Sequence, residues 1–311
     1  MEDMIKIENL VKRYGDVLAL DHLNLEIRKG EIFGLLGPNG SGKTTAINCI
    51  LSLLKYDRGN IEVFGKPMTP TSYDTKREIG VVFQNVAVFE QMSVYENIDY
   101  FCSLYVNDKE KRREYVEEAI EFTGLNDYRK KRPKQLSGGL LRRLNIACGI
   151  AHKPRLVFFD EPTVAVDPQS RNHILEGIQQ MNHDGSTIVY TSHYMEEVEQ
   201  ICTRIAILDR GKCIASGTSD ELKSMIRTGE TITIEEIALD EETLEAIRNL
   251  DNVFSLSYTG ETLKLKYSSA GNLLGLLHYL EDHNLAFGKI FSEKPTLNDV
   301  FLEITGKELR D

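Results

Sequence analysis

The segment from Gly37 to Thr44 has the residue types and spacing of a phosphate-binding loop. It reads Gly-Pro-Asn-Gly-Ser-Gly-Lys-Thr and matches the pattern G-x-x-x-x-G-K-[S/T]. Glycines let the chain turn tightly enough for successive backbone N–H groups to point at phosphate oxygens, and a helix beginning near Thr44 adds the positive end of its dipole. Lys43 can place its charge on the β- and γ-phosphates, and the Thr44 hydroxyl can bind Mg²⁺. This segment, the phosphate loop, predicts nucleotide binding.

A pair of carboxylates, Asp160 and Glu161, ends the apolar run Leu156–Phe159. In a parallel sheet the ligands gather at the carboxyl ends of the strands, so we expect both side chains at the ligand edge. Asp160 can hold Mg²⁺ directly or through water, and Glu161 can orient and deprotonate an attacking water. An ordinary polar strand end is the alternative, and the phosphate loop in the same chain makes it the weaker one.

A second anion cradle is indicated at Ser137-Gly138-Gly139, before the run Leu140–Ala147. Ser137 is suited to cap a helix, and two glycines open the backbone at the helix N-terminus. Simple capping is the alternative interpretation of this turn taken alone. A chain with one phosphate loop rarely needs a second phosphate cradle of its own.

Composition excludes several classes of protein. The chain has 311 residues and a formal net charge of −11, so it lacks the electrostatic footprint of a general nucleic-acid binder. Its length predicts two domains, and 41% hydrophobic residues permit a sizeable core. No apolar run approaches the ~18 residues of a membrane span, and the N-terminus has no secretory signal, so a membrane role must come through a partner. Five scattered cysteines indicate reduced thiols in the cytosol.

Hydrophobic patterning predicts the elements that position these residues. Strands alternate with helices, which predicts a mainly parallel α/β sheet. From about residue 93 to 152 helical periodicity dominates and predicts a helical insertion. Predicted strands lie within 1–30 and at 32–36, 61–64, 79–83, 156–159, 186–190, 204–208 and 212–215, and predicted helices lie at 44–54, 168–184 and 195–202.

A smaller second domain is expected after residue 227, so the predicted domains are 1–227 and 228–311. Its predicted order is β-α-β-β-α-β, the ferredoxin-like pattern, followed by a short helix that begins at Thr296 with Asp299 in capping-box spacing. The predicted elements are strand 231–235, helix 241–250, strands 253–258 and 262–267, helix 270–282, strand 286–291 and helix 296–304.

The order of these motifs resembles that of the ATP-binding subunits of ABC transporters, over about residues 4–220. Gly37–Thr44 resembles the family's Walker A loop, and Leu156–Asp160 with Glu161 resembles its Walker B strand and catalytic glutamate. The other matches are Leu136–Leu140 to the signature motif, Gln84 to the Q-loop, Ala165–Asp167 to the D-loop, His193 to the switch histidine and Tyr14 to the aromatic residue that stacks on adenine. Leu140 and Val166 stand where the family usually has glutamine and leucine.

The resemblance implies a P-loop NTPase fold and an ATPase that uses ATP and Mg²⁺. The implied catalytic residues are Glu161, His193, Gln84 and Lys43, and the implied metal contacts are Thr44, Gln84 and Asp160. Nucleotide contacts are implied for Tyr14, Gly37, Pro38, Asn39, Gly40, Ser41, Gly42, Lys43, Thr44, Thr45, Ser137 and Gly139.

The resemblance also explains the second cradle. Two such subunits dimerise head to tail, with ATP between the Walker A loop of one and the signature motif of the other. One intact set of motifs favours a homodimer. With one phosphate loop and no span, the chain is expected to need separate permease subunits and to lie on the cytoplasmic face of the membrane.

The C-terminal segment Pro295–Leu302 with Thr305-Gly306 resembles the tail of daunorubicin-type resistance exporters, a group that includes proteins acting against polyenes. The expected function is therefore ATP-driven export of a drug, antibiotic or lipid-like molecule. Asn85–Tyr95 is expected to help form a groove for a coupling helix of the permease. The alternatives are a soluble non-transport ABC ATPase, which usually carries long coiled coils or two phosphate loops, and an importer ATPase, whose regulatory domain tends to be all-β.

Overall fold

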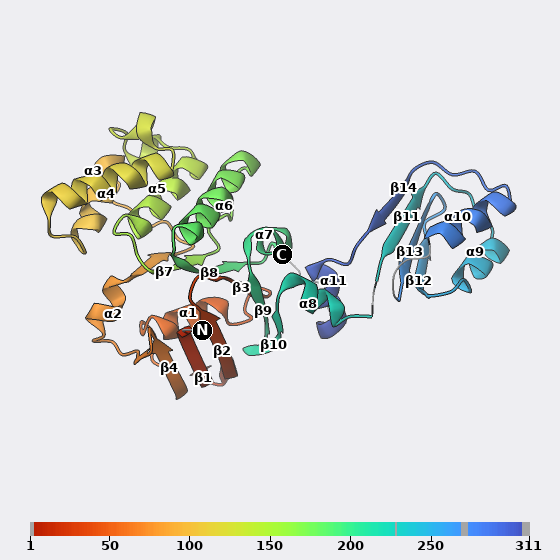
Figure 1. Ribbon diagram of the computed structural model, residues 1–311, viewed down its shortest axis with the longest axis horizontal. Helices are drawn as coiled ribbons and strands as arrows, with labels where there is room; N and C mark the ends of the chain where they lie inside the picture. The colour runs from red at the N-terminus through yellow and green to blue at the C-terminus, as the bar shows by residue number, and fades with distance from the viewer. Residues whose placement is uncertain (1–2, 228, 269–272, 307–311) are drawn as a thin grey trace. The chain divides into compact units, whose positions relative to one another are not determined.

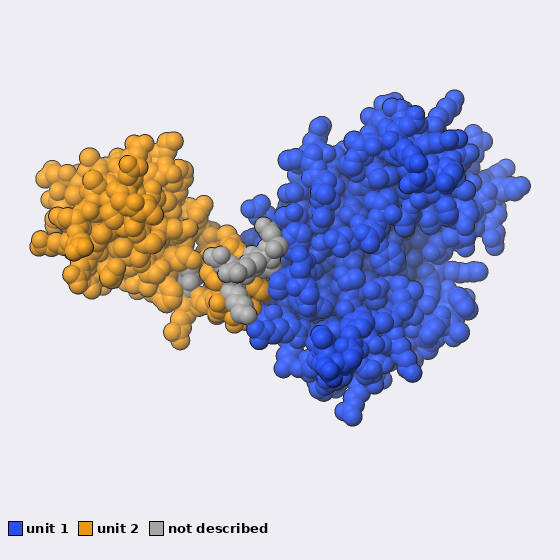
Figure 2. Space-filling view, turned by 180° about the vertical axis from the view of Figure 1, so that it is seen from behind, with its two compact units in different colours: residues 1–218, 310–311 blue, residues 219–309 orange. Residues whose placement is uncertain are grey.

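The computed structural model describes residues 3–227, 229–268 and 273–306. It divides into two compact units, Met1–Thr218 and Ser219–Leu309 (Figure 2). The sequence predicts a boundary after residue 227, whereas the structure divides before α8 (Ser219–Ser224). The reason is that α8 packs against α11 (Leu297–Thr305), the last helix of the second unit.

The first unit is built on a central sheet in the order β10-β9-β3-β8-β7-β6 (Figure 1). Neighbouring strands are parallel except for β9 and β10, which confirms the predicted mainly parallel sheet. All residues of β3 and β7 are buried, as expected for apolar strands covered on both faces. The strands are β3 (Ile32–Leu36), β6 (Ile79–Val82), β7 (Leu156–Asp160), β8 (Thr187–Ser192), β9 (Arg204–Asp209) and β10 (Lys212–Gly217).

A second sheet of the first unit is antiparallel, in the order β2-β1-β4-β5. Its apolar residues share one buried core with those of the central sheet and with Ala46 and Ile47 of α1 (Lys43–Ile50). The helix that follows the phosphate loop is thereby fixed to both sheets. The strands are β1 (Asp3–Tyr14), β2 (Val17–Arg28), β4 (Arg58–Val63) and β5 (Lys66–Pro67).

The segment of the predicted helical insertion forms a group of helices with its own core (Figure 1). Its first helix begins at Ser93, whose side chain accepts from the Glu96 amide while the Glu96 carboxylate accepts from the Ser93 amide. The helices are α3 (Val94–Ser103), α4 (Lys109–Phe122) and α5 (Gly138–Ile150), with short 3₁₀ turns at Asn126–Tyr128 and Pro133–Gln135. The remaining helices of the unit are α2 (Tyr73–Arg77), α6 (Pro168–His183) and α7 (Met195–Ile201). Among the described residues, no helix is long and apolar enough to cross a membrane.

The second unit has the predicted β-α-β-β-α-β order. Its antiparallel sheet runs β12-β13-β11-β14, so the first and third strands lie in the middle, which is the ferredoxin-like arrangement. Its last strand lies later than predicted, because the pairing with β11 begins at Ile290. The elements are β11 (Thr231–Glu235), α9 (Glu241–Arg248), β12 (Val253–Tyr258), β13 (Thr262–Tyr267), α10 (Leu273–Asp282) and β14 (Ile290–Glu293).

Candidate nucleotide-binding site

The phosphate loop joins β3 to α1, as its chemistry requires. Gly37 has a φ of 156°, and a Cβ there would lie 2.3 Å from the carbonyl oxygen of Leu208. Gly42 has a φ of 109°, and its Cβ would lie 2.8 Å from the carbonyl oxygen of Ala19. Both positions therefore require glycine, because the backbone of neighbouring elements passes too close for a side chain.

Lys43 is buried beneath this loop. Its Nζ donates to the carbonyl oxygens of Gly37 (2.6 Å) and Pro38 (3.2 Å) and lies 3.7 Å from Oε1 of Glu161. Burial lowers the pKa of Lys43, and the carboxylates of Glu161 and Asp160 oppose that shift only in part. Lys43 and Asp160 are 117 residues apart in the sequence. The phosphate loop and the carboxylate pair thus meet at the side chain of Lys43.

Asp160, at the end of β7, is bonded to hydroxyls on two sides. Thr44 Oγ1 donates to Asp160 Oδ2 (3.0 Å), and Thr191 Oγ1 donates to Asp160 Oδ1 (2.7 Å). Hydroxyl and carboxylate oxygens side by side are ligands that Mg²⁺ prefers, and this ion usually completes its shell with water and substrate phosphates. The predicted metal contacts Thr44 and Asp160 therefore lie together.

Glu161 follows at once and turns the chain. Its φ is 49°, a left-handed conformation that is costly for a residue with a side chain and is often found at functional sites. Its Oε2 accepts from Gln84 Nε2 (3.3 Å) and lies 3.4 Å from Nδ1 of His193. All four residues predicted to be catalytic, Lys43, Gln84, Glu161 and His193, are thus gathered around the Glu161 carboxylate.

The signature turn, Ser137–Gly139, is built differently. Ser137 is exposed, and its hydroxyl accepts from the Leu140 amide (3.3 Å) at the start of α5. Gly139 is buried, and a Cβ there would lie 2.5 Å from Oγ of Ser170 and 3.0 Å from Oδ2 of Asp167. Asp167 in turn caps α6 by accepting from the Ser170 amide (2.9 Å). The turn is therefore fixed by the segment that contains the predicted D-loop.

The loop fits a phosphate group. Ser41 is buried, and its Oγ is without a hydrogen-bond partner within the described part of the chain. A buried hydroxyl in that state costs free energy that a bound anion at the loop would recover. The glycine backbone and the hydroxyl of Ser41 together suit a phosphate oxygen.

Comparison with known proteins decides the family. A family model described as ABC transporter matches residues 20–164. The chain is 38% identical to the linearmycin resistance ATP-binding protein LnrL of Bacillus subtilis (strain 168), over 99% of this chain and 100% of that protein. The chain belongs to the ABC transporter family.

Two further likenesses extend this assignment. The ABC chain is 33% identical to the daunorubicin resistance ATP-binding protein DrrA3 of Streptomyces coeruleorubidus, over 98% of this chain and 97% of that protein. It also resembles the dimeric structure of a post-hydrolysis state of the ATP-binding cassette MJ0796 bound to ADP and Pi. That likeness has a TM-score of 0.64 and 28% identity, over 69% of this chain and 98% of the cassette. The chain is an ABC-type ATPase with the P-loop NTPase fold, and it binds ATP.

The other predicted nucleotide contacts of the ABC chain lie at the surface. Asn39, Gly40 and Thr44 are exposed, while Pro38 and Thr45 are partly buried. Tyr14 ends β1 with 49% of its surface exposed and with Lys12 Nζ 5.1 Å from its ring centre. An exposed ring of this kind is free to stack on a flat ligand.

Two residues of the site were not predicted. Thr191 binds Asp160 through its hydroxyl, which also accepts from the Glu161 amide (3.0 Å). Arg142 of α5 is buried and donates to the carbonyl oxygens of Phe83, Gln84 and Glu161, at 3.0, 2.8 and 3.1 Å. Arg142 thus ties the helical insertion to the segments that carry Gln84 and Glu161. The sequence does not single it out, because Arg143 is charged as well and stands beside it on the same helix.

Proposed function

We propose that this chain is the ATP-hydrolysing subunit of an ABC exporter that moves a drug, antibiotic or lipid-like molecule through separate permease subunits. The observation that carries the proposal is the likeness to LnrL, which extends over the second unit as well as the ATPase unit. DrrA3 matches over almost the same length. Their names are linearmycin resistance and daunorubicin resistance ATP-binding protein, and export from the cell is a direct route to resistance.

The ATP phosphates would be held by the phosphate loop and by Lys43. The backbone of the loop and the Ser41 hydroxyl would face phosphate oxygens, and Lys43 would exchange its bonds to loop carbonyls for bonds to the β- and γ-phosphates. Tyr14 would stack on the adenine, and Pro38, Asn39 and Thr45 would line the same loop. Mg²⁺, held by Thr44 and Asp160 with Gln84 nearby, would offset phosphate charge.

Glu161 would act as the general base. Its carboxylate lies beside Gln84 and His193, so these three side chains would orient a water at this point. Glu161 would accept a proton from that water as the water oxygen bonds to the γ-phosphorus and the bond from the γ-phosphorus to the β–γ bridging oxygen breaks, so that ADP and phosphate leave. Lys43 and His193 would stabilise the charge on the phosphate oxygens. Catalysis would then consist of positioning and charge stabilisation.

The second half of each site would come from a second copy of the chain. Ser137 is exposed and its turn is fixed from behind by Asp167 and Ser170. The exposed Ser137 would contact the γ-phosphate bound by a partner chain, and the buried Gly139 would let the turn pack closely against Ser170 and Asp167 behind it. A homodimer joined head to tail would form two identical sites.

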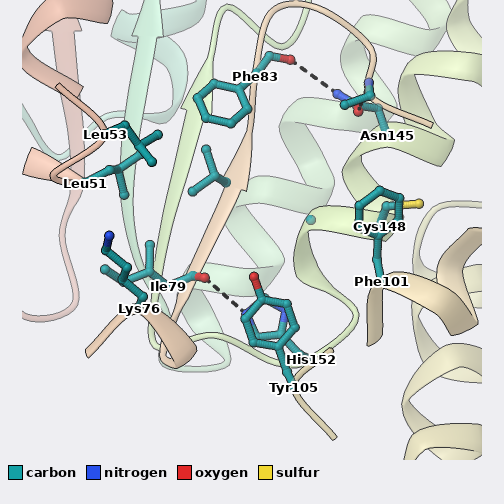
Figure 3. Close-up of a pocket in the computed structure, with 13 residues that line it drawn as sticks. Leu51, Leu53, Lys76, Ile79, Phe83, Phe101, Tyr105, Asn145, Cys148 and His152 are labelled. Atoms are coloured by element: carbon teal, nitrogen blue, oxygen red, sulfur yellow. Dashed lines mark hydrogen bonds between the residues drawn. The ribbon is translucent and has the colours of Figure 1, made fainter. Parts of the chain in front are cut away.

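The permease would contact a groove beside the site (Figure 3). The groove has a volume of about 320 Å³, with Phe83 and Asn145 at one end and the stacked rings of Tyr105 and His152 at the other. Burial lowers the pKa of His152 to about 4, so its imidazole is neutral near pH 7, and Lys76 is the charged residue that lines the groove. Ala87, from the predicted segment 85–95, also lines it.

An apolar helix or loop of the permease suits these walls. Phe83 and Ala87 flank Gln84 in sequence, and Gln84 donates to Glu161. A permease segment seated in the groove would therefore press on the same stretch of chain that contacts the general base, and would hold the ATPase at the cytoplasmic face of the membrane.

The first experiment is purification of the tagged full-length chain from detergent-solubilised membranes of its host, followed by mass spectrometry. We expect one polytopic membrane protein in stoichiometric amount, and a complex whose ATPase rate responds to an amphipathic antibiotic. A soluble complex with no membrane protein would favour the alternative of a non-transport ABC ATPase. A complex containing a substrate-binding receptor would favour an importer.

The groove is tested with Ala87→Glu, which places a charge at an exposed position on the groove wall. We expect loss of the co-purifying permease with the ATPase rate of the isolated chain retained. Val17→Glu, on a residue of β2 that is 66% exposed, is the matched control and should keep the permease. Retention of both permease and export in Ala87→Glu would count against the groove.

A further inference from the structure

A buried carboxylate lies outside the set of residues assigned above. Glu197 of α7 is only 3% exposed. Burying a charged group is costly unless it is paired or hydrogen-bonded. The partners of Glu197 therefore show what the carboxylate holds in place.

One oxygen of Glu197 joins β8 to the turn that follows β7, beside the catalytic side chains. Its Oε2 accepts hydrogen bonds from three hydroxyls, those of Thr163 (2.7 Å), Tyr190 (2.7 Å) and Ser192 (3.1 Å). Thr163 follows Glu161 by two residues, and Ser192 directly precedes His193. A single carboxylate thus ties the segment after the general base to the strand that ends at the histidine.

The Ser192 hydroxyl also contacts Tyr194, the residue that follows His193. The Tyr194 amide donates to Ser192 Oγ at 2.9 Å. A carboxylate only accepts, so the Ser192 proton is directed to Glu197 and an oxygen lone pair remains for the Tyr194 amide. The residues before and after His193 are therefore both held.

The second oxygen of Glu197 reaches the histidine by another path. Its Oε1 lies 3.3 Å from Nε of Arg171, and the Arg171 guanidinium lies 5.0 Å from the ring centre of Tyr194. The Tyr194 ring lies against the His193 ring, with centres 4.1 Å apart. A cation over an aromatic face holds that face in place. The imidazole of His193 is thus in contact with both the Tyr194 ring and the Glu161 carboxylate.

We propose that Glu197 is a positioning residue for ATP hydrolysis, which holds His193 against Glu161 through Ser192, Tyr194 and Arg171. The Glu197 carboxylate is bonded to Thr163, Tyr190 and Ser192 and lies beside Arg171, so it acts on His193 through other residues. The inference rests on the roles proposed above for His193 and Glu161. In this role Glu197 affects the geometry around the γ-phosphate, whereas the phosphate loop determines the affinity for the nucleotide.

The test is Glu197→Gln in the full-length chain. The glutamine has the same size, and its amide group places N–H donors opposite either Arg171 or the three hydroxyls, all of which are donors. We expect kcat for ATP hydrolysis to fall about tenfold or more, as for other small misplacements of a reacting group, with the Kd for ATP unchanged. We also expect the imidazole signal of His193 to shift in the ¹H–¹⁵N spectrum of histidine-labelled protein.

Glu196→Gln is the matched control, because Glu196 is the preceding residue of α7 and is exposed. It should leave the kcat, the Kd and the His193 signal unchanged. The His193 signal is assigned by its loss in His193→Gln. An unchanged kcat in Glu197→Gln overturns the inference. An unmoved His193 signal also overturns it, even where activity falls, because a loss that accompanies only a lowered melting temperature reflects stability and not the position of His193. A parental ATPase rate in His193→Gln would instead overturn the proposed role of the histidine, so the two failures are distinguishable.

Discussion

The phosphate loop and the signature turn both suit a phosphate group, but the chain builds them in opposite ways. Around the phosphate loop, Lys43, Asp160 and Glu161 are buried, with Lys43 beside Glu161 and with Asp160 bonded to Thr44. At the signature turn, Ser137 is exposed and its hydroxyl serves its own helix. The difference teaches that the chain assembles the phosphate loop and its carboxylates by itself, whereas the signature turn has an exposed serine that suits the proposed contact with a second chain.

The largest effect on the assembled half is expected from Glu161→Gln. Removing the general base should lower ATP turnover about 10²–10⁴-fold, because the attacking water keeps its proton. ATP binding should persist, and the bound nucleotide should trap a dimer that size-exclusion chromatography with light scattering detects. Glu176→Gln, an exposed glutamate of α6, is the control and should hydrolyse normally. Hydrolysis by Glu161→Gln at the parental rate would show that the base is another group.

Lys43→Ala tests the same half through its charge. Without the ammonium group the phosphates lose a buried partner, so turnover should fall about 10²–10³-fold. ATP affinity should fall too, which separates this variant from Glu161→Gln when binding is measured by calorimetry. Lys55→Ala removes an exposed lysine shortly after α1 and should bind ATP as the parent does. Unchanged ATP affinity in Lys43→Ala would contradict the assignment.

The exposed half is tested by mixing two inactive chains. Ser137→Glu places a negative charge where the partner's phosphate would lie, and a carboxylate is tolerated at a helix N-terminus. A mixture of Ser137→Glu and Lys43→Ala contains dimers with one intact site, formed by the loop of the first chain and the signature turn of the second. About a quarter of the parental sites should return in an equal mixture of a symmetric dimer.

The control mixture is Lys43→Ala with Glu161→Gln. Both changes affect the half that the chain assembles by itself, so each site of every mixed dimer stays defective and no activity returns. The readout is phosphate release at matched total protein. Absence of recovery in the first mixture would contradict a shared site in a homodimer.

The sequence predicts the assembled half well, because local chemistry dictates its residue types. A loop that surrounds a phosphate needs glycines and a lysine at fixed spacing, and the strand end needs carboxylates. Arg142 and Glu197 follow no such spacing. Arg142 reaches a carbonyl 59 residues away, and Glu197 reaches a hydroxyl 34 residues away, and both meetings exist only after the fold has formed.

In the fold, too, local patterns are predictable from the sequence, whereas contacts between distant segments are not. Alternating strands and helices predict the parallel sheet, and the order of elements predicts the topology of the second unit. β1 pairs with β4, although β2 and the phosphate loop lie between them in the sequence. Neither strand alone predicts this pairing. The division before α8 likewise depends on the packing of α8 against α11, which are far apart in sequence.

The smallest expected effect concerns how firmly the signature turn is fixed, and two adjacent glycines test it. Gly139→Ala brings a Cβ within 2.9 Å of Ser170 Cβ and 3.0 Å of Asp167 Oδ2, so the start of α6 must shift. Overpacking of this kind costs about 1–3 kcal/mol of unfolding free energy. Gly138→Ala is the matched control, because a Cβ there has no neighbour within 4 Å in the described structure.

Denaturant unfolding of both full-length variants measures the difference. Gly138→Ala should change the unfolding free energy by less than about 0.5 kcal/mol, as exposed substitutions usually do. A loss confined to Gly139→Ala would show that the outward-facing half is held by contacts within the chain before any partner arrives. Equal losses in the two variants would mean that the turn is held by its own helix. The phosphate loop and the signature turn would then differ only in how exposed their residues are.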